Sequence, residues 1–415
     1  MTLVKTSILS LIATLVKVSS GLVINKAVAM YIGPSGLALI GQFQNFIQII
    51  MTISGGLFNT GVVRYCAKYQ HEQNKLVSIM STAFLLSLIS SVVVGIFLIV
   101  FNNVLADFIL KDASYSFVYI LLGFTLILFT LNNFFLSILN GMKKIKTFIL
   151  ITVLQSLYSL VFSTLLIVFF NIEGALIAMA TNQSIIFLFT INRMKRYAVF
   201  KINNFNQGID LNSFKSLSKF AAMAITSALV LPISHIYIRN YLGESVSWEA
   251  AGYWQAIWLI SATYLMLITL TLQTYYLPRL SEISNKKELD KEVVSGYKII
   301  MPIVIFTSFI IYFLREFIVI TLFTESFMPI VSLLIWQLIG DIIRVSSLLL
   351  SKNVVAKAKY KIHIFSEIIF SLSFVILSIH LIDAYGVSGI LFAYIINYTI
   401  YFFYMLIVFK RYLNE

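Results

Sequence analysis

The residues best suited to bind a ligand in this sequence are cations that interrupt long apolar segments. Lys17 and Lys26 lie in the first such segment, and Arg64 and Arg239 lie at the ends of later ones. A charged side chain at mid-bilayer costs from about 2.5 to more than 10 kcal/mol, so such groups normally face a bundle interior or a wet cavity. Because lysine and arginine bind phosphate and amides hydrogen-bond sugars, these cations and the amides near them predict a site for a large anionic, hydroxyl-rich solute.

Lys17 and Lys26 are not expected to share one face of their helix. They are nine positions apart, so at about 100° per residue they point to nearly opposite sides unless Gly21 distorts the helix. One of them is therefore expected to extend toward the membrane surface, and Lys26, nearer the end of the segment, is the better candidate.

Amide side chains are the second group of candidate ligand-binding residues. Gln42, Gln44 and Asn45 lie in the second apolar segment, and Gln255 lies in the eighth. The alternative is hydrogen bonding between helices, worth about 0.6 to 2 kcal/mol each. The sequence leaves both interpretations open.

Asp341, Arg344 and Glu367 are candidates for coupling transport to proton movement. Asp341 and Arg344 are three positions apart on one helix face, which also permits a self-compensating ion pair. Glu367 has only His363 as a partner within one helical turn. An intramembrane carboxylate of this kind either belongs to a proton relay or is structural.

Several classes of chemistry lack their residues in this chain. It has one cysteine, Cys66, and four histidines, which leaves little for disulfides, redox chemistry or a metal site. Neither a GxxxxGK[ST] phosphate loop nor an HExxH or GxSxG motif occurs in the sequence. The residues needed for ATP hydrolysis and for the commoner hydrolase mechanisms are therefore absent. We expect no cofactor, no metal and no enzyme activity.

The composition predicts that membrane-spanning helices position these residues. Of 415 residues, 60% are hydrophobic and 11% are charged, against about half and a quarter in soluble domains. Apolar runs long enough to cross a bilayer recur along the whole chain. The predicted fold is all-α and polytopic, with about twelve transmembrane helices at 6–31, 37–63, 78–101, 117–140, 147–170, 174–192, 217–240, 250–276, 297–322, 328–350, 362–381 and 387–409.

The positive charge of the chain predicts its orientation. Of 30 cations, 24 fall in the connections on the side of the N-terminus, including the run Lys143, Lys144 and Lys146. The positive-inside rule then places both termini in the cytoplasm. The net charge of +13 is thus explained by topology and by attraction to anionic membrane lipids, and a nucleic-acid partner is not expected.

The chain also contains a weak internal repeat. Tyr31-Ile-Gly-Pro-Ser resembles Tyr241-Leu-Gly-Glu-Ser, Lys144-Ile-Lys146 resembles Lys359-Tyr-Lys361, and Gly174 corresponds to Gly389, at offsets of 210 to 215 residues. We expect a six-helix lobe at 1–195, a cytoplasmic linker at 196–216 and a second six-helix lobe at 217–415. Six spans between copies predict lobes related by a pseudo-two-fold axis along the membrane normal, with the substrate between them.

Motifs spread over nearly the whole chain resemble those of the Wzx-type flippases of lipid-linked oligosaccharides, the family of the O-antigen and lipid III flippases. These flippases belong to the multidrug/oligosaccharidyl-lipid/polysaccharide exporter superfamily. The motifs are Thr14-Leu-Val-Lys17, Gly33-Pro-Ser-Gly-Leu-Ala38, Gly41-Gln42, Leu217-Ser-Lys-Phe220, Trp254-Gln255, Leu277-Pro-Arg-Leu280, Trp336-Gln-Leu338 with Gly340-Asp341, and Ala356-Lys357-Ala358.

The resemblance implies transport of an undecaprenyl-diphosphate-linked oligosaccharide from the cytoplasmic to the periplasmic leaflet of a bacterial inner membrane. It implies that Lys17, Lys26, Arg64 and Arg239 hold the diphosphate, and that a polysaccharide polymerase and a chain-length regulator are partners. Because the segments from 78 to 192 depart most from the lipid III type, an O-antigen repeat unit is the expected cargo.

Two other functions compete with flipping as interpretations of the sequence. A drug/cation antiporter of the same superfamily would need a cavity dominated by acids, and the sequence offers few. A membrane-embedded polysaccharide polymerase or glycosyltransferase would need catalytic groups on a substantial outer loop. The longest predicted outer connection, 102–116, carries only Asp107, Lys111 and Asp112.

Overall fold

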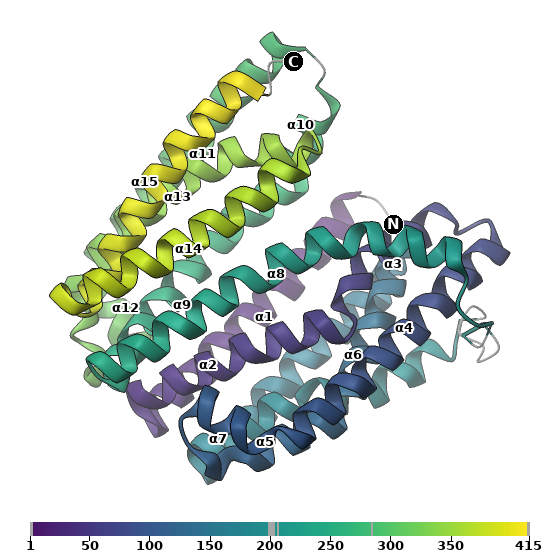
Figure 1. Ribbon diagram of the computed structural model, residues 1–415, viewed down its shortest axis with the longest axis horizontal. Coiled ribbons are helices and arrows are strands. Elements are labelled where there is room, and N and C mark those ends of the chain that lie inside the picture. Colours follow the sequence, from purple (N-terminus) through teal and green to yellow (C-terminus); the bar gives the residue numbers. More distant parts are fainter. Residues whose placement is uncertain (1–2, 198–203, 206, 284, 413–415) are drawn as a thin grey trace. The chain divides into compact units, whose positions relative to one another are not determined.

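The computed structural model describes residues 3–197, 204–205, 207–283 and 285–412; for 3–8, 219–224, 227 and 412 it describes only the backbone. Every regular element in this part of the chain is helical (Figure 1). Packing divides the chain into two units. The first comprises Met1–Ile32 and Leu39–Ile233, and the second comprises Gly33–Ala38 and Ser234–Glu415. Helices α2 and α8 each contribute residues to both units.

The first unit is built from helices of very different length. In it α1 packs against α7, α7 against α6, and α6 against α3 and α4. The bounds are α1 (Leu3–Tyr31), α2 (Gly33–Met51), the π-helical η1 (Thr52–Gly56), α3 (Leu57–Lys68), α4 (Gln73–Val100), α5 (Asn102–Leu105), η2 (Ala106–Leu110), η3 (Ala113–Tyr115), α6 (Ser116–Gly141), α7 (Ile145–Met194) and the first part of α8 (Leu211–Ser245).

The second unit repeats this arrangement with α13 at its centre, against which α9, α10, α11 and α15 pack. Its other elements follow the same order as their counterparts in the first unit. They are α9 (Trp248–Thr271), η6 (Leu272–Tyr276), α10 (Leu277–Glu282), α11 (Lys286–Phe313), α12 (Arg315–Leu322), η7 (Glu325–Phe327), α13 (Ile330–Ala356), α14 (Tyr360–Tyr385) and α15 (Val387–Tyr412).

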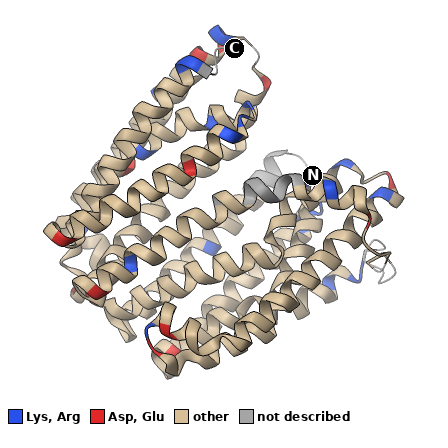
Figure 2. Cartoon of the chain, in the orientation of Figure 1, with Lys and Arg blue, Asp and Glu red and all other residues tan. Residues whose placement is uncertain are grey.

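Ten helices of the described residues are long and apolar enough to cross a membrane. Two differences separate this number from the twelve predicted spans. The 50-residue α7 covers both 147–170 and 174–192, because it joins two helices across a kink at Asn171, whose backbone angles are not helical. The predicted span 217–240 lies within α8, part of whose side chains are outside the description. Long helical stretches without charged residues separate the charged ends (Figure 2).

Helices of the first unit approach closely at glycines. A Cβ on Gly95 of α4 would lie 2.7 Å from the carbonyl oxygen of Gly123 on α6, and a Cβ on Gly123 would lie 2.8 Å from that of Gly95. Inside a bilayer the lipid tails are as apolar as leucine, so helices associate through such close packing and through hydrogen bonds. The glycine pair therefore sets the contact between α4 and α6.

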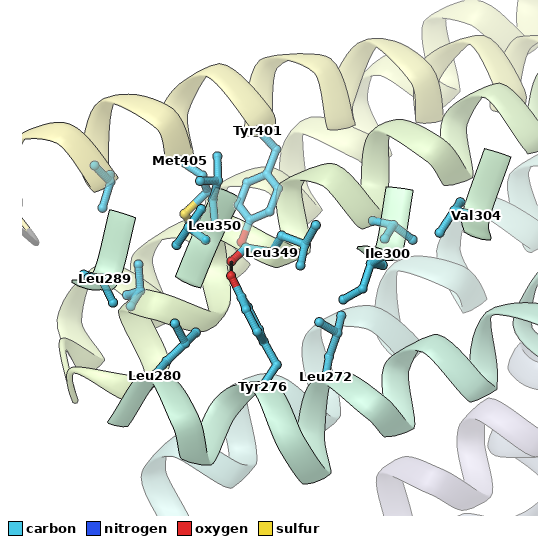
Figure 3. Close-up of a cluster of buried hydrophobic side chains, with 14 of the residues drawn as sticks. Leu272, Tyr276, Leu280, Leu289, Ile300, Val304, Leu349, Leu350, Tyr401 and Met405 are labelled. Carbon is cyan, nitrogen blue, oxygen red and sulfur yellow. Dashed lines mark hydrogen bonds between the residues drawn. The ribbon is translucent and has the colours of Figure 1, made fainter. Parts of the chain in front are cut away.

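The second unit is held together by a cluster of apolar side chains near one end of its helices. Figure 3 shows Tyr276 and Tyr401 entering this cluster from opposite sides, with Leu349 and Leu350 between them. The hydroxyl group of Tyr276 donates to the carbonyl oxygen of Leu349 at 3.4 Å. All four residues are at most 7% exposed, so the interior here is filled by side chains.

Local backbone geometry supports the predicted internal repeat. Asn171 (φ 49°, ψ −128°) and Gly386 (φ 57°, ψ −132°) share one unusual conformation and are 215 residues apart. Lys143 and Ala358, also 215 apart, both have positive φ values, 56° and 53°. Such values are uncommon outside glycine, so coincidence at two matched positions is a poor explanation. The two halves therefore share the same backbone conformation at these turns.

The described part of the predicted linker is packed rather than extended. The hydroxyl group of Ser81 on α4 donates to the carbonyl oxygens of Phe205 and Gly208, and Thr82 accepts from the backbone N–H of Asp210. The side chain of Asp210 accepts from the N–H of Ser213 at 2.8 Å and so caps α8. Residues 198–203 and 206 of the linker lie outside the described residues, and the boundaries 1–195, 196–216 and 217–415 stay a prediction.

Candidate functional site

A cavity of about 650 Å³ lies inside the first unit. Its wall comes from five helices, α1, α2, α3, α6 and α7. Of its lining residues seven carry amides, five carry hydroxyl groups, one is a lysine and none is an acid: Lys17, Ser20, Gly21, Ile24, Gln44, Ile47, Asn59, Val63, Phe129, Asn133, Leu136, Ser137, Asn140, Phe148, Thr152, Gln155, Ser156, Ser159, Met179, Asn182 and Gln183. The volume falls within the range of roughly 300 to 1,000 Å³ typical of small-molecule sites.

Helical periodicity brings the polar residues of α6 and α7 to this wall. Asn133, Ser137 and Asn140 recur at intervals of four and three on α6, which places them on one face. Thr152, Gln155, Ser156 and Ser159 follow the same pattern on α7. These residues were not among the predicted ligand-binding residues, although their spacing of three, four and seven positions in the sequence is a signal for one polar helix face.

Some of the lining polar groups are already occupied by the fold. The hydroxyl groups of Ser137, Thr152 and Ser156 donate to backbone carbonyls one turn earlier, and the amide nitrogen of Asn182 donates to the hydroxyl group of Ser159. These bonds hold the wall in place. The seven amide residues of the wall supply both oxygens that accept and nitrogens that donate further hydrogen bonds.

Three of those amide oxygens have no hydrogen-bond partner in the described part of the chain. They are Oδ1 of Asn59, Oδ1 of Asn182 and Oε1 of Gln183, each shielded from solvent. An acceptor left unpaired in this way costs about 1 to 3 kcal/mol. Because these oxygens are shielded from the cavity as well as from bulk solvent, they do not by themselves specify a ligand.

Lys17 is the one cation among the lining residues. No described residue forms a hydrogen bond or an ion pair with its ammonium group, and its side chain is exposed. Lys26, nine residues later on α1, is half-buried, does not line the cavity and has another interaction. The two lysines therefore have different surroundings, as their nine-residue spacing predicted.

The structure brings only two of the predicted ligand-binding residues to this cavity, Lys17 and Gln44. Gln42 is fully buried, Arg64 is exposed on α3, and both make other interactions. Asn45 also lies outside the lining. These three residues, like Lys26, are near the cavity in sequence but do not form its wall.

Arg239 and Gln255 lie in the second unit and contact each other. The guanidinium group of Arg239 donates to Oε1 of Gln255 at 2.5 Å and lies 5.4 Å from the ring centre of Trp254. Both side chains are at most 5% exposed. The polar contact and the cation–π contact stabilise a buried cation, so its position is accounted for by packing within this unit.

Asp341 and Arg344 do not form the direct ion pair that their spacing permits. Tyr394 lies between them: its hydroxyl group donates to Asp341 at 2.9 Å and accepts from Arg344 at 3.3 Å. The carboxylate of Asp341 also accepts from Ser261, Tyr264 and Gln337, at 2.7, 2.8 and 3.0 Å. Four donors on one fully buried carboxylate form a network that ties α9, α13 and α15 together.

Glu367 has the partner that its sequence context predicted. Nδ1 of His363, one turn earlier on α14, lies 4.0 Å from its carboxylate. Lys352 on α13 also interacts electrostatically with this carboxylate. Glu367 is therefore part of a small charged group separate from the Asp341 network.

The fold and the match to known sequences define the class of this protein. A family model described as polysaccharide biosynthesis protein matches residues 3–284, and the chain belongs to that family. It is a multi-pass membrane protein, as predicted.

Individual relatives extend over almost the whole chain. The lipid III flippases of Escherichia coli strain K12 and Shigella flexneri are each 28% identical to it over 403 residues, 97% of this chain and 97% of theirs. These matches confirm the resemblance to flippases of lipid-linked oligosaccharides.

Solved structures show the fold. An inward-facing multidrug resistance transporter of the MATE family, in the MOP superfamily, superposes with a TM-score of 0.81 at 15% identity, over 95% of this chain and 94% of that one. A MOP superfamily transporter from Pyrococcus furiosus, whose structure is described as having a binding pocket of reverse polarity, gives 0.70 at 18% identity over 99% and 96%. The predicted all-α polytopic fold of this superfamily is confirmed.

Proposed function

We propose that this protein flips a lipid-linked oligosaccharide across the inner membrane of a bacterium. The observation that carries the proposal is the cavity of the first unit, whose lining residues combine Lys17 with seven amides and no acid. An ammonium group attracts phosphate, and amides hydrogen-bond hydroxyl groups. The family and the lipid III flippases that match 97% of the chain support the same cargo class.

The finer features of the transport reaction are part of the proposal. The cargo is an undecaprenyl-diphosphate-linked unit, such as an O-antigen repeat unit, which moves from the cytoplasmic to the periplasmic leaflet. The positive-inside rule, applied to 24 of the 30 cations, supports cytoplasmic termini. A polysaccharide polymerase and a chain-length regulator are the protein partners that this role implies. Asp341, Arg344 and Glu367 are the candidates for energy coupling.

A drug/cation antiporter is the second function within the same superfamily. The MATE transporters share the fold at 15–17% identity, a level at which fold similarity says nothing of cargo. An organic cation would be repelled by Lys17 and would find no carboxylate among the lining residues. The charge of the cavity therefore favours an anionic cargo.

The test is flipping by the purified full chain in proteoliposomes. The probe is undecaprenyl diphosphate that carries a neutral trisaccharide, and the readout is the access of an added glycosidase to the probe. We expect flipping by the wild type, a loss of about tenfold in Lys17→Ala, equivalent to about 1.4 kcal/mol, and retention in Lys17→Arg.

Lys68→Ala serves as the matched control, because Lys68 is an exposed cation of α3 outside the cavity lining. It should flip the probe at the wild-type rate. Absence of flipping by the wild type would overturn the proposed function. Equal rates for the wild type and Lys17→Ala would remove Lys17 from the mechanism.

A further inference from the structure

The membrane-spanning helix Gly33–Lys68 is broken near its middle. It is long and apolar enough to be a single span, yet the π-helical η1 divides it into α2 and α3. At Gly55 the φ angle of 168° is extended, so the two helices meet at a kink. Short π-helical segments within helices occur frequently at functional sites. The break is therefore a candidate for a moving part.

The two pieces of this helix are held by different neighbours. A Cβ on Gly141 of α6 would lie 2.6 Å from the carbonyl oxygen of Val63, so α3 is packed tightly against α6. Residues 33–38, at the far end of α2, belong to the second unit, where Gly252 packs directly on the carbonyl group of Pro34. The break thus separates a piece that is fixed within the first unit from a piece whose far end is fixed elsewhere.

The break also interrupts the wall of the cavity. Upstream of η1, α2 contributes Gln44 and Ile47 to the lining, and downstream of it α3 contributes Asn59 and Val63. Bending at η1 changes the distance between these two stretches of wall. The position of the break therefore sets the width of the cavity on this side.

Two serines of α4 face the broken backbone. The hydroxyl group of Ser90 lies 2.6 Å from the carbonyl oxygen of Ser54 and 2.8 Å from that of Leu86 in its own helix. Inside a bilayer, a carbonyl group at a helix break needs a donor of this kind. Ser87, one turn before Ser90, is buried beside Gly55, and its hydroxyl group has no hydrogen-bond partner among the described residues. One of two adjacent donors is thus used.

The absence of a side chain at Gly55 allows the break to lie close to α6. A Cβ at this position would lie 2.5 Å from Cγ2 of Thr130. The hydroxyl groups of Ser54 and Thr130 are 3.1 Å apart, which also joins the break to α6. The observed position of η1 therefore depends on glycine at position 55.

We propose that η1 is a hinge with two positions. In the position described here, Ser90 holds the carbonyl group of Ser54; in the other, α2 bends and Ser87 becomes the donor to the backbone of η1. Release by Ser90 leaves it the carbonyl oxygen of Leu86, and the new bond of Ser87 offsets the one that is lost. A few residues that absorb a change of backbone angles are sufficient for such a hinge. The movement goes beyond the proposed function, because it does not depend on which cargo the cavity takes.

The experiment measures distances between pairs of spin labels on the full chain in lipid nanodiscs. Cys66→Ala first removes the single native cysteine, and Gln48→Cys on α2, Thr60→Cys on α3 and Phe124→Cys on α6 supply exposed attachment points outside the cavity lining. Labels at positions 48 and 124 report the movement of α2. Labels at positions 60 and 124 are the matched control, since α3 is fixed to α6 and their distance should stay constant.

The two serines should act in opposite directions. Ser90→Ala should shift the populations of the first label pair about fivefold toward a second distance, as expected for the loss of one hydrogen bond worth about 1 kcal/mol. Adding Ser87→Ala should reverse this shift. Gly55→Ala should act in the same direction as Ser90→Ala, because its methyl group meets Thr130. Thr130→Ser removes Cγ2 but keeps the hydroxyl group, so adding it to Gly55→Ala should restore the wild-type distance.

Three outcomes would overturn the hinge. They are an unchanged distance in all variants, a shift in Ser90→Ala that Ser87→Ala does not reverse, and an equal change in the control pair. Serines that only stabilise the fold would lower the temperature of thermal unfolding without moving the labels. If Gly55→Ala does not fold, the serine variants decide, since alanine in place of serine introduces no new contact. Absence of flipping by the wild type would overturn the proposed function and leave the hinge standing.

Discussion

The two units have the same backbone plan, yet the positions that line the amide-rich cavity of the first unit carry different side chains in the second. Matched positions 215 residues apart show where the interiors diverge. Residues that line the cavity in the first unit correspond to large rings in the second: Gln155 to Phe370, Ser159 to Phe374, Met179 to Tyr394 and Gln183 to Tyr398. The difference lies in the side chains and not in the path of the chain.

These rings pack against one another in the second unit. The ring centres of Tyr394 and Tyr398 are 4.8 Å apart, and those of Phe374 and Tyr394 are 6.0 Å apart. Arg344 corresponds to the cavity residue Phe129 and lies 5.3 Å from the ring centre of Trp258. The same scaffold therefore holds a closed aromatic and ionic core in one half and a polar cavity in the other.

The first unit therefore has a polar cavity at positions where the second unit has side chains that bond to one another. A cation in the first unit, Lys17, faces a cavity, whereas Arg344 in the second is bonded to Tyr394. Buried groups that are fully hydrogen-bonded stabilise and specify a fold. Exchanging residues between matched positions tests whether side chains alone make this difference.

The largest loss of stability is expected when a residue of the second unit is replaced by the residue at the matched position of the first unit. Tyr394→Met removes a fully buried ring and the hydroxyl group that joins Asp341 to Arg344. We expect a loss of about 3 to 5 kcal/mol in the free energy of unfolding, from the cavity and from unpaired buried groups. Thermal unfolding in detergent measures it, and a loss below about 1 kcal/mol would show that the network does not hold this unit.

A smaller loss of stability, equal in the two units, is expected at matched glycines that have the same surroundings. A Cβ on Gly174 would lie 1.9 Å from the carbonyl oxygen of Leu166, and one on Gly389 would lie 2.1 Å from that of Leu381. Gly174→Ala and Gly389→Ala should each cost about 2 to 3 kcal/mol, because a backbone group must move in either turn. Unfolding of the two single variants tests this, and a difference of more than twofold between them argues against equivalent turns.

The reverse exchange should affect transport and spare stability. Met179→Tyr introduces a ring into the cavity, where there is space for it, so the free energy of unfolding should change by less than about 1 kcal/mol. Flux of the trisaccharide probe should fall about tenfold, equivalent to about 1.4 kcal/mol, because the ring fills part of the cavity. Unchanged flux with a folded variant would mean that the cavity is not on the transport route.

The smallest loss of stability is expected at Asp210, whose side chain caps the N-terminus of α8. Hydrogen bonds from the side chain and the backbone of Ser213 lower the pKa of the Asp210 carboxyl group below its ordinary value of 3.8. Its stabilising contribution is therefore present above that value and is lost as the pH falls through the lowered pKa. Asp210→Ala should cost about 1 kcal/mol at pH 7.

Asp210→Asn is the control for that prediction, because asparagine caps a helix about as well as aspartate but does not titrate. Thermal unfolding between pH 7 and pH 3 should show a difference between the wild type and Asp210→Asn only at the acidic end. A constant difference across this range would assign the effect to something other than the cap.

Some of the site could be predicted from the sequence and some could not. Lys17 was recognised because a cation amid apolar residues needs an explanation. Arg239 looked equivalent, but its contacts with Gln255 and Trp254 come from another helix and cannot be read from its own segment. The ion pair that the spacing of Asp341 and Arg344 permits is absent for the same reason: Tyr394, which lies between them, is 50 residues beyond Arg344 in the chain.

The sequence alone determined the all-helical membrane fold, the duplication and the cargo class, because apolar run length, residue spacing and motifs are local properties of the chain. Only the tertiary structure decided that the polar faces of α6 and α7 meet Lys17 of α1 around a cavity, while their counterparts in the second half are closed by rings. Whether an interior is open depends on side-chain volumes that several helices bring to one place. No single segment carries that information.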